Sequence, residues 1–244
     1  MKENIYDVAK NKLIFALDVP DLNTAKKWLR LLSTKVGCFK IGLQLFLEAG
    51  TQVIKIVKET TGNKVFLDLK LHDIPSTVLA ACHQLQKYQV DFLSVFPPCY
   101  PHLFSEFQTG PTKIIGVTVL TYLDTPSLFA LGIKEEFAYN PIKLVLRRAQ
   151  LAKEAGCKGI VCSGQEVKQV KNLLGQEFIA ITPGIRLKGN QAYDQKRITT
   201  PYEAIKNGSD YLVVGRIIRL APKPEQVIER ILEEISLALR PNQV

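Results

Sequence analysis

The sequence predicts a single-domain (β/α)8 barrel, the TIM barrel, over residues 1–244, and three observations support this prediction. The chain has 244 residues, 46% of them hydrophobic, and no Gly/Ser-rich linker divides it, which suits one domain with one large core. Short apolar runs recur along the chain, and helical patterns separate them. The runs are nearly continuous in apolar character, as expected for parallel strands that are buried on both faces.

Eight such runs are the predicted strands. They fit the closed barrel better than a doubly wound open sheet, because "DVPDLNT" after the first run lacks the GxGxxG of dinucleotide-binding sheets. The runs are "KLIFALDV" (12–19), "CFKIGL" (38–43), "KVFLDLKL" (64–71), "DFLSVF" (91–96), "KIIGVTVL" (113–120), "GIVCSG" (159–164), "FIAITPG" (178–184) and "YLVVGR" (211–216).

The predicted helices each have one apolar face. "NTAKKWLRLLSTKVG" (23–37) has a possible N-cap at Asn23 and ends at Gly37. The same pattern returns in "PIKLVLRRAQLAKEAGC" (141–157) and "PEQVIERILEEISLAL" (224–239). In the first of these helices the apolar stripe consists of Ala25, Trp28, Leu29, Leu32 and Val36.

Composition excludes several classes of protein. Lys and Arg exceed Asp and Glu by 32 to 23, but they are spread along the chain without a basic tract, so we expect no nucleic-acid partner. The apolar run "LIFAL" (13–17) is too short to span a membrane, and "MKENIYDVAK" does not resemble a secretory signal. The five cysteines are scattered without CxxC, which indicates free thiols in the cytoplasm. The three histidines have no metal-binding spacing, so we expect no metal.

Polar residues gather where the predicted strands end, which is where barrels of this kind place their active sites. Singly, each has an ordinary explanation, such as a helix cap for Asp18 or a surface charge for Lys40. Together they predict a functional site. The residues are Asp18 in strand one, Lys40 in strand two, Asp68 and Lys70 in strand three, Thr121 after strand five, Gly184 to Arg186 after strand seven, and Gly215 and Arg216 at strand eight.

The charges at these positions limit the chemistry. Asp18, Lys40, Asp68, Lys70 and Asp73 could form a chain of alternating sign, in which each lysine stays protonated between carboxylates. Such a lysine is a poor Schiff-base nucleophile but a good proton donor and electrostatic clamp. Glycine and arginine after strands seven and eight, in "TPGIR" and "VGR", favour a phosphate site. The residues alone therefore predict proton-transfer chemistry on a phosphorylated small molecule, without an organic cofactor.

A family resemblance extends this prediction. "DLKLHDIPST" (68–77) resembles the DxKxxDI signature of the orotidine 5'-phosphate decarboxylases. "FALDVP", "FKIGLQLF", "VTVLT", "TPGIR", "DQKRITTP" and "VGR" resemble the other blocks of that family in order, so the match runs from about residue 12 to 235. Related Mg²⁺-dependent sugar-phosphate enzymes share DxKxxD but generally carry an acid where this chain has Lys40.

The resemblance implies a role for each matching residue. Lys70 would protonate C6 of the pyrimidine as carbon dioxide leaves, and Asp68 would lie beside the departing carboxylate. Lys40 and Asp18 would hold the ribose hydroxyls. The product would be UMP, made in pyrimidine biosynthesis without any cofactor.

The resemblance also implies a homodimer with shared active sites. Asp73, Ile74 and Thr77 would reach into the site of the neighbouring subunit. Thr121 would contact the pyrimidine, and the phosphate would be held by Arg186, Gln195, Gly215 and Arg216.

Two alternatives remain at this stage. One is a Mg²⁺-dependent 3-keto-gulonate-phosphate decarboxylase or hexulose-phosphate synthase. The other is a non-catalytic barrel that binds a nucleotide or RNA.

Overall fold

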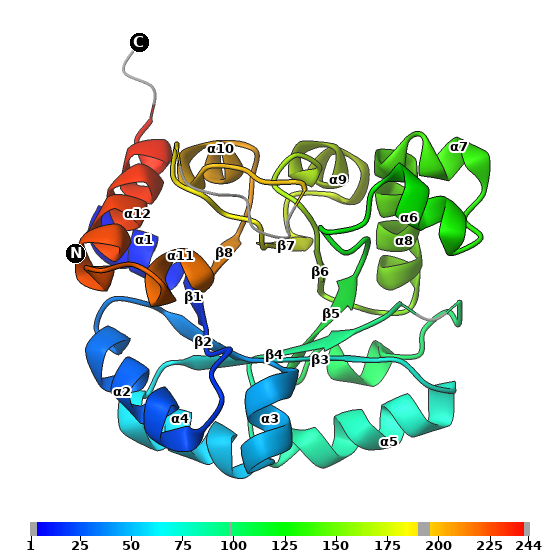
Figure 1. Ribbon diagram of the computed structural model, residues 1–244. Helices are drawn as coiled ribbons and strands as arrows, with labels where there is room; N and C mark the ends of the chain where they lie inside the picture. The colour runs from blue at the N-terminus through cyan, green and yellow to red at the C-terminus, as the bar shows by residue number, and fades with distance from the viewer. Residues whose placement is uncertain (1–3, 98, 190–195, 242–244) are drawn as a thin grey trace.

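The computed structural model describes residues 4–97, 99–189 and 196–241 (Figure 1). Its eight strands form a closed barrel in the order β1 to β8, all neighbours are parallel, and β8 pairs with β1. This confirms the predicted barrel and every predicted strand, although most strands are shorter than the apolar runs that predicted them. They are β1 (Leu13–Ala16), β2 (Cys38–Ile41), β3 (Lys64–Leu71), β4 (Phe92–Val95), β5 (Lys113–Val117), β6 (Gly159–Val161), β7 (Ile179–Thr182) and β8 (Tyr211–Val214).

The helices surround the strands (Figure 1). One expected unit differs, because the described chain between β4 and β5 contains the short 3-10 helix η1 (Ser105–Phe107) instead of an α-helix. Within the described ranges, no helix is both long and apolar enough to cross a membrane. The α-helices are α1 (Ile5–Asn11), α2 (Leu22–Leu32), α3 (Leu43–Ala49), α4 (Gln52–Thr61), α5 (Pro75–Gln86), α6 (Thr125–Ala130), α7 (Glu135–Ala138), α8 (Pro141–Glu154), α9 (Val167–Leu174), α10 (Pro201–Lys206), α11 (Arg216–Arg219) and α12 (Pro224–Leu239).

The N-terminus of α2 corrects one prediction. Asp21, not Asn23, is the N-cap, because its backbone is extended and its carboxylate accepts a hydrogen bond from the N–H of Thr24 at 2.8 Å. The helix therefore starts at Leu22. The predicted apolar stripe is correct: four of its members are buried, and Trp28 packs partly buried against them.

The apolar core has two parts. The larger part lies between the strands and the surrounding helices, and the smaller part fills the inside of the barrel. Within the smaller part, the rings of Phe66 and Phe92 meet edge to face, with centroids 6.1 Å apart. Phe66 also lines the cavity described below, so this inner layer forms the floor of the site. The inner layer consists of Ile14, Cys38, Phe66, Phe92, Ile115 and Ile181.

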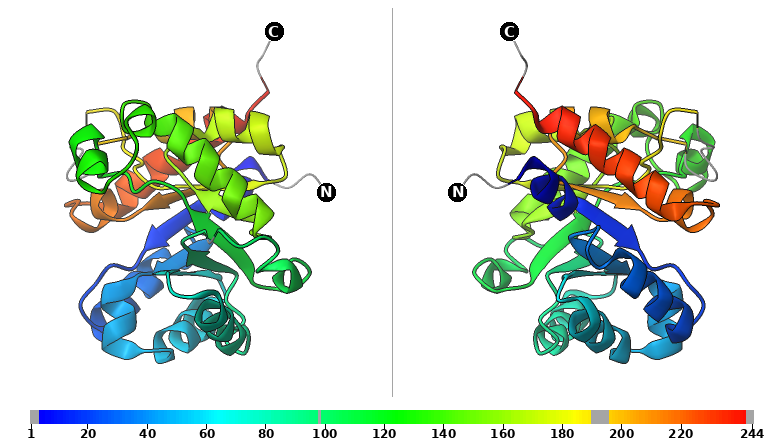
Figure 2. Two further views of the ribbon diagram at one scale, coloured as in Figure 1. Left: turned by 90° about the vertical axis from the view of Figure 1, so that its right-hand side faces the viewer. Right: turned by 90° about the vertical axis from the view of Figure 1, so that its left-hand side faces the viewer.

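The first and last helices, α1 and α12, pack together where the barrel closes between β8 and β1. In the side views of Figure 2, α1 lies beside α12. The hydroxyl of Tyr6 on α1 donates to the carboxylate of Glu229 on α12 at 2.7 Å. Because α1 precedes β1 and α12 follows β8, this contact supports the first and last strands, which carry Asp18 and Arg216 at their ends.

Candidate active site

A cavity of about 220 Å³ opens at the carboxyl ends of the strands. Its walls are partly charged and partly apolar, and Phe66, Val117 and Val119 contribute to the apolar part. The cavity brings together most of the residues that the sequence predicted. Those that line it are Asp18, Lys40, Asp68, Lys70, Thr121, Gly184, Arg186, Gly215 and Arg216.

Four charged groups form a continuous chain along one wall. Lys40 Nζ lies 3.0 Å from Asp18 Oδ1 and 3.5 Å from Asp68 Oδ2. Lys70 Nζ lies 2.9 Å from the same Oδ2 of Asp68. Only 9% of Lys40 and 8% of Asp68 are exposed, so a surface charge does not explain Lys40. The predicted alternation of charge is confirmed for these four residues.

The chain holds its two central groups in their charged forms. Burial raises the pKa of Asp68, but Lys40 and Lys70 outweigh it, and the pKa lies below its ordinary value. Burial likewise lowers the pKa of Lys40, but Asp68 and Asp18 outweigh it and raise the pKa above its ordinary value. Both groups therefore carry full charge at neutral pH although both are buried.

A bulge in β3 lies at Asp68 and Lys70, whose side chains line the cavity. The register between β3 and β4 pairs Leu67 with Leu93 and Leu71 with Val95, so the three residues 68–70 stand opposite Ser94 alone. Lys70 has a φ of 52°, a left-handed conformation that is costly for a residue with a Cβ. Bulges of this kind commonly redirect side chains beside active sites.

Ser94 stabilises the bulge and was not predicted from the sequence. Its hydroxyl donates to Asp68 Oδ1 at 2.8 Å and accepts the backbone N–H of Lys70 at 2.9 Å, and the residue is completely buried. One signal could have identified it, because Ser94 is the single polar residue inside the apolar run of β4. It thereby fixes the Asp68 carboxylate and the backbone of Lys70 relative to each other.

Gly42 was also not predicted, and it makes room for the first ion pair. A Cβ at this position would lie 2.7 Å from Asp18 Oδ1 and 3.1 Å from Lys40 Nζ. A larger residue would therefore force the Asp18 carboxylate, and with it the ion pair, to shift. This explains why "FKIG" continues from Lys40 to a glycine at the end of β2.

Asp73 does not join the chain of charges within one subunit, contrary to the expected five-residue alternation. It is exposed, and its carboxylate accepts the N–H of Ile74 at 2.7 Å, immediately before α5. The short "HDIP" turn carries Asp73 away from the cavity that Lys70 lines. Ile74 and Thr77 are exposed as well.

The opposite side of the site is cationic. Arg186 is buried, and its Nη1 donates to the carbonyl of Ile185 at 2.8 Å. Gly215 is the N-cap of α11, and Arg216 begins that helix. Two arginines in one cavity with Lys40 and Lys70 favour an anionic ligand. Gln195, the other predicted phosphate ligand, lies outside the described residues.

Comparisons with known proteins agree with this geometry. The sequence profile of the "Orotidine 5'-phosphate decarboxylase / HUMPS family" matches residues 11–231. The orotidine 5'-phosphate decarboxylase of Desulfosudis oleivorans is 41% identical over 237 residues, which cover 95% of each chain. That of Moorella thermoacetica is 39% identical over 249 residues, which cover 97% of each chain. The crystal structure of orotidine 5'-phosphate decarboxylase from Lactobacillus acidophilus matches 91% of this chain and 98% of its own, with a TM-score of 0.76 and 32% identity. This chain therefore belongs to the orotidine 5'-phosphate decarboxylase / HUMPS family.

Proposed function

We propose that this protein decarboxylates orotidine 5'-phosphate to UMP in pyrimidine biosynthesis, without a cofactor. The observation that carries the proposal is the chain of charges from Asp18 through the buried Lys40 and Asp68 to Lys70, which lines the same cavity as Arg186. Relatives about 40% identical over nearly the whole chain are named for this activity. A free-thiol set of five cysteines supports a cytoplasmic location.

The proposed mechanism uses fixed charge in place of an electron sink. When the bond from C6 to the carboxylate breaks, its electron pair stays on C6 in the plane of the ring and cannot delocalise into the π-system. The Lys70 ammonium stabilises this carbanion and transfers its proton to C6, and water later reprotonates the amine. Asp68 faces the carboxylate that leaves and raises the energy of the bound substrate relative to the transition state.

The remaining side chains would position the substrate. Asp18 and Lys40 hold the ribose hydroxyls, which suits an ion pair whose two residues both line the cavity. The phosphate lies at the arginine side, where a guanidinium fork matches its oxygens. The proposed contacts are Thr121 for the pyrimidine and Arg186, Gln195, Gly215 and Arg216 for the phosphate.

The proposed enzyme is a homodimer in which Asp73, Ile74 and Thr77 complete the partner's site. Their exposure supports this arrangement, because Ile74 is a large apolar side chain that is 63% exposed in one subunit. On α3, Leu47 is 82% exposed and adds apolar surface that a second subunit could cover.

The deciding experiment is UMP formation from orotidine 5'-phosphate by the purified protein in the presence of EDTA. We expect full turnover, because the ammonium of Lys40 already lies between the carboxylates of Asp18 and Asp68, where a Mg²⁺-dependent relative would need free acids. Activity that disappears with EDTA and returns with Mg²⁺ would favour the sugar-phosphate enzymes. Salt-sensitive RNA binding without any turnover would favour a non-catalytic barrel.

A further inference from the structure

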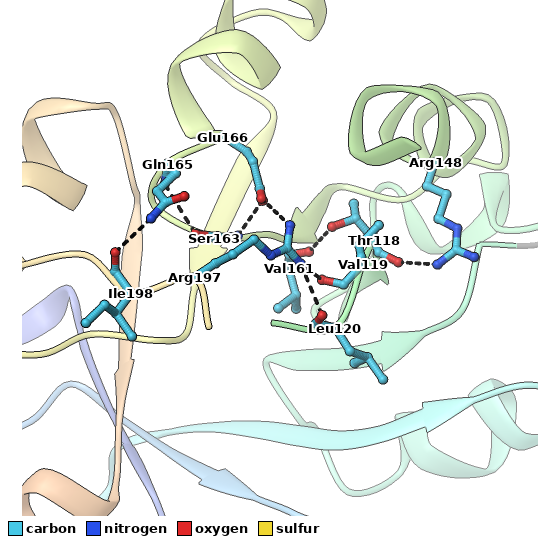
Figure 3. Close-up of polar contacts among 10 residues, drawn as sticks. All are labelled: Thr118, Val119, Leu120, Arg148, Val161, Ser163, Gln165, Glu166, Arg197 and Ile198. Carbon is cyan, nitrogen blue, oxygen red and sulfur yellow. Dashed lines mark hydrogen bonds and ion pairs between the residues drawn. The ribbon is translucent and has the colours of Figure 1, made fainter. Parts of the chain in front are cut away.

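Another ion pair, formed by Arg197 and Glu166, lies at the carboxyl end of the barrel (Figure 3). The guanidinium of Arg197 contacts the carboxylate of Glu166 through Nη1. Its Nη2 donates to the carbonyl oxygens of Val119 at 2.8 Å and Leu120 at 3.1 Å. Both charged side chains are largely buried. Arg197 thus joins the chain that follows β5 to the residue that precedes α9.

Glu166 is fixed on its other side by the chain that follows β6. Its second carboxylate oxygen accepts the N–H of Ser163 at 2.8 Å. Burial raises the pKa of Glu166, and the charge of Arg197 opposes the rise. A buried carboxylate of this kind is costly without its partner, so the two residues hold each other in place. Ser163 directly follows Cys162, which lines the cavity.

Arg197 belongs to residues 196–200, here named the returning segment, which leads from the β7 loop into α10. This segment bonds directly to two walls of the cavity. The N–H of Lys196 donates to the carbonyl of Thr121 at 3.1 Å. Thr199 donates its N–H to the carbonyl of Gly184 at 3.1 Å and accepts the N–H of Arg186 at 3.0 Å.

The returning segment packs against Gly164 so closely that residue 164 has no room for a side chain. A Cβ there would lie 2.7 Å from Thr199 Oγ1 and 2.9 Å from Thr199 Cβ. The segment could not approach the end of β6 this closely if residue 164 had a side chain. A second neighbour, Gln165, donates through Nε2 to the carbonyl of Ile198 at 3.1 Å (Figure 3).

We propose that Arg197 and Glu166 are positioning residues that set the distance between the Thr121 wall and the Gly184–Arg186 wall of the cavity. Neither side chain is among the residues that line the cavity, so they act through the backbone that they hold. The inference rests on the proposed function, in which the pyrimidine meets Thr121 and the phosphate meets Arg186. A substrate that is gripped at both ends needs the two walls at a fixed separation, because a displacement of about 1 Å can cost about 100-fold in rate.

The test compares Glu166 with Asp210, a carboxylate that also pairs with one buried cation but is more exposed, at 34% against 6% of the side chain. Asp210 lies at the amino end of β8, away from the cavity, and accepts from Lys171 Nζ at 2.7 Å and from the N–H of Ala180 at 2.8 Å. Glu166 likewise accepts from one cation and one backbone N–H. Glu166→Gln and Asp210→Asn therefore remove the same kind of charge pairing at opposite ends of the barrel.

We expect both variants to lower the Tm, but only Glu166→Gln to impair the site. It should lower kcat/KM by about 30-fold or more, chiefly by raising KM, and should weaken UMP binding by about tenfold. Asp210→Asn should stay within about threefold of the parent in both measurements. Arg197→Lys should keep most of the parent Tm, because it retains the positive charge. It should lose most of the parent kcat/KM, because an ammonium lacks the fork that reaches a carboxylate and two carbonyls.

Amide hydrogen exchange gives a readout that does not depend on activity. Residues 119–121 and 184–186 should exchange faster in Glu166→Gln than in the parent, and at the parent rate in Asp210→Asn. The proposal is wrong if exchange there is unchanged, or if folded Glu166→Gln or Arg197→Lys keeps the parent kcat/KM. A parent that does not turn over orotidine 5'-phosphate would instead refute the proposed function, and the exchange data would still decide the positioning role.

Discussion

Removal of the Ser94 hydroxyl should lower both the stability of the protein and its catalytic rate, because the hydroxyl contacts the Asp68 carboxylate and the backbone N–H of Lys70. In Ser94→Ala, the buried Asp68 carboxylate loses a hydrogen bond, which is worth about 1.5–3 kcal/mol for a charged acceptor. The N–H of Lys70 also loses its acceptor, at a further cost of about 1–3 kcal/mol. We expect the free energy of unfolding to fall by about 3–5 kcal/mol, so a domain in the middle or upper part of the usual range of about 5–15 kcal/mol stays folded.

Catalysis should fall as well, because the left-handed backbone of Lys70 costs about 1–3 kcal/mol and this hydrogen bond helps to hold it. Once Lys70 relaxes, its ammonium moves away from Asp68, and kcat should drop by about 100-fold. Urea denaturation gives the first quantity, and UMP formation gives the second.

Ser209→Ala is the matched control. Ser209 is also buried, and its hydroxyl lies 2.8 Å from that of Thr182, which is an uncharged partner. Neither Ser209 nor Thr182 is among the residues that line the cavity. It should cost about 1 kcal/mol of stability and leave kcat unchanged. The interpretation of Ser94 is refuted if Ser94→Ala loses no more stability than Ser209→Ala and keeps the parent kcat.

Three further outcomes follow from the site. Lys70→Ala and Asp73→Asn subunits should each be nearly inactive alone and should regain part of the activity when mixed, since one site of each heterodimer carries neither defect; no recovery despite proven subunit exchange would exclude shared sites. Arg216→Ala should lose about 3 kcal/mol or more in kcat/KM for orotidine 5'-phosphate and almost nothing for orotidine, whereas an equal loss for both would show that Arg216 does not serve the phosphate. For pH, Lys40 and Lys70 hold the pKa of Asp68 below its ordinary 3.8, so its stabilisation is complete above that value and is lost as the pH falls through the folded-state pKa. Urea titrations should therefore show the stability difference between the parent and Asp68→Asn shrinking only below about pH 4, and shrinkage near pH 7 would contradict the lowered pKa.

The convergence of the charged residues could be predicted because it needs only strand order. Lys40 and Asp68 are far apart in sequence, but parallel strands of a closed barrel end at one rim, so residues at those ends must meet. The apolar runs fixed which segments are strands, and helix periodicity fixed which faces are buried. The exact ends of the strands were less predictable. The apolar run of β1 continues beyond Ala16, where the strand ends, so hydrophobicity alone does not mark that end.

Other features depend on contacts that periodicity does not encode. The role of Ser94 depends on a bulge that changes the register of β3 against β4. No residue type in "DLKL" predicts that bulge. Arg197 contacts Glu166 and the carbonyls of Val119 and Leu120 only after three loops have folded over one another. In sequence it belongs to a polar loop segment with nothing to identify its partners.

The net charge of the four-residue chain has one further consequence. Two carboxylates and two ammonium groups make it neutral, so it exerts little long-range attraction on a substrate that carries a phosphate and a carboxylate. Capture from solution is then left to the arginine side and to the overall charge of +9. Dissolved salt screens attraction at long range far more than contacts inside a closed site. Ionic strength should therefore govern how often substrate arrives and leave the bond-breaking step almost untouched, so capture and chemistry are assigned to separate sets of charges.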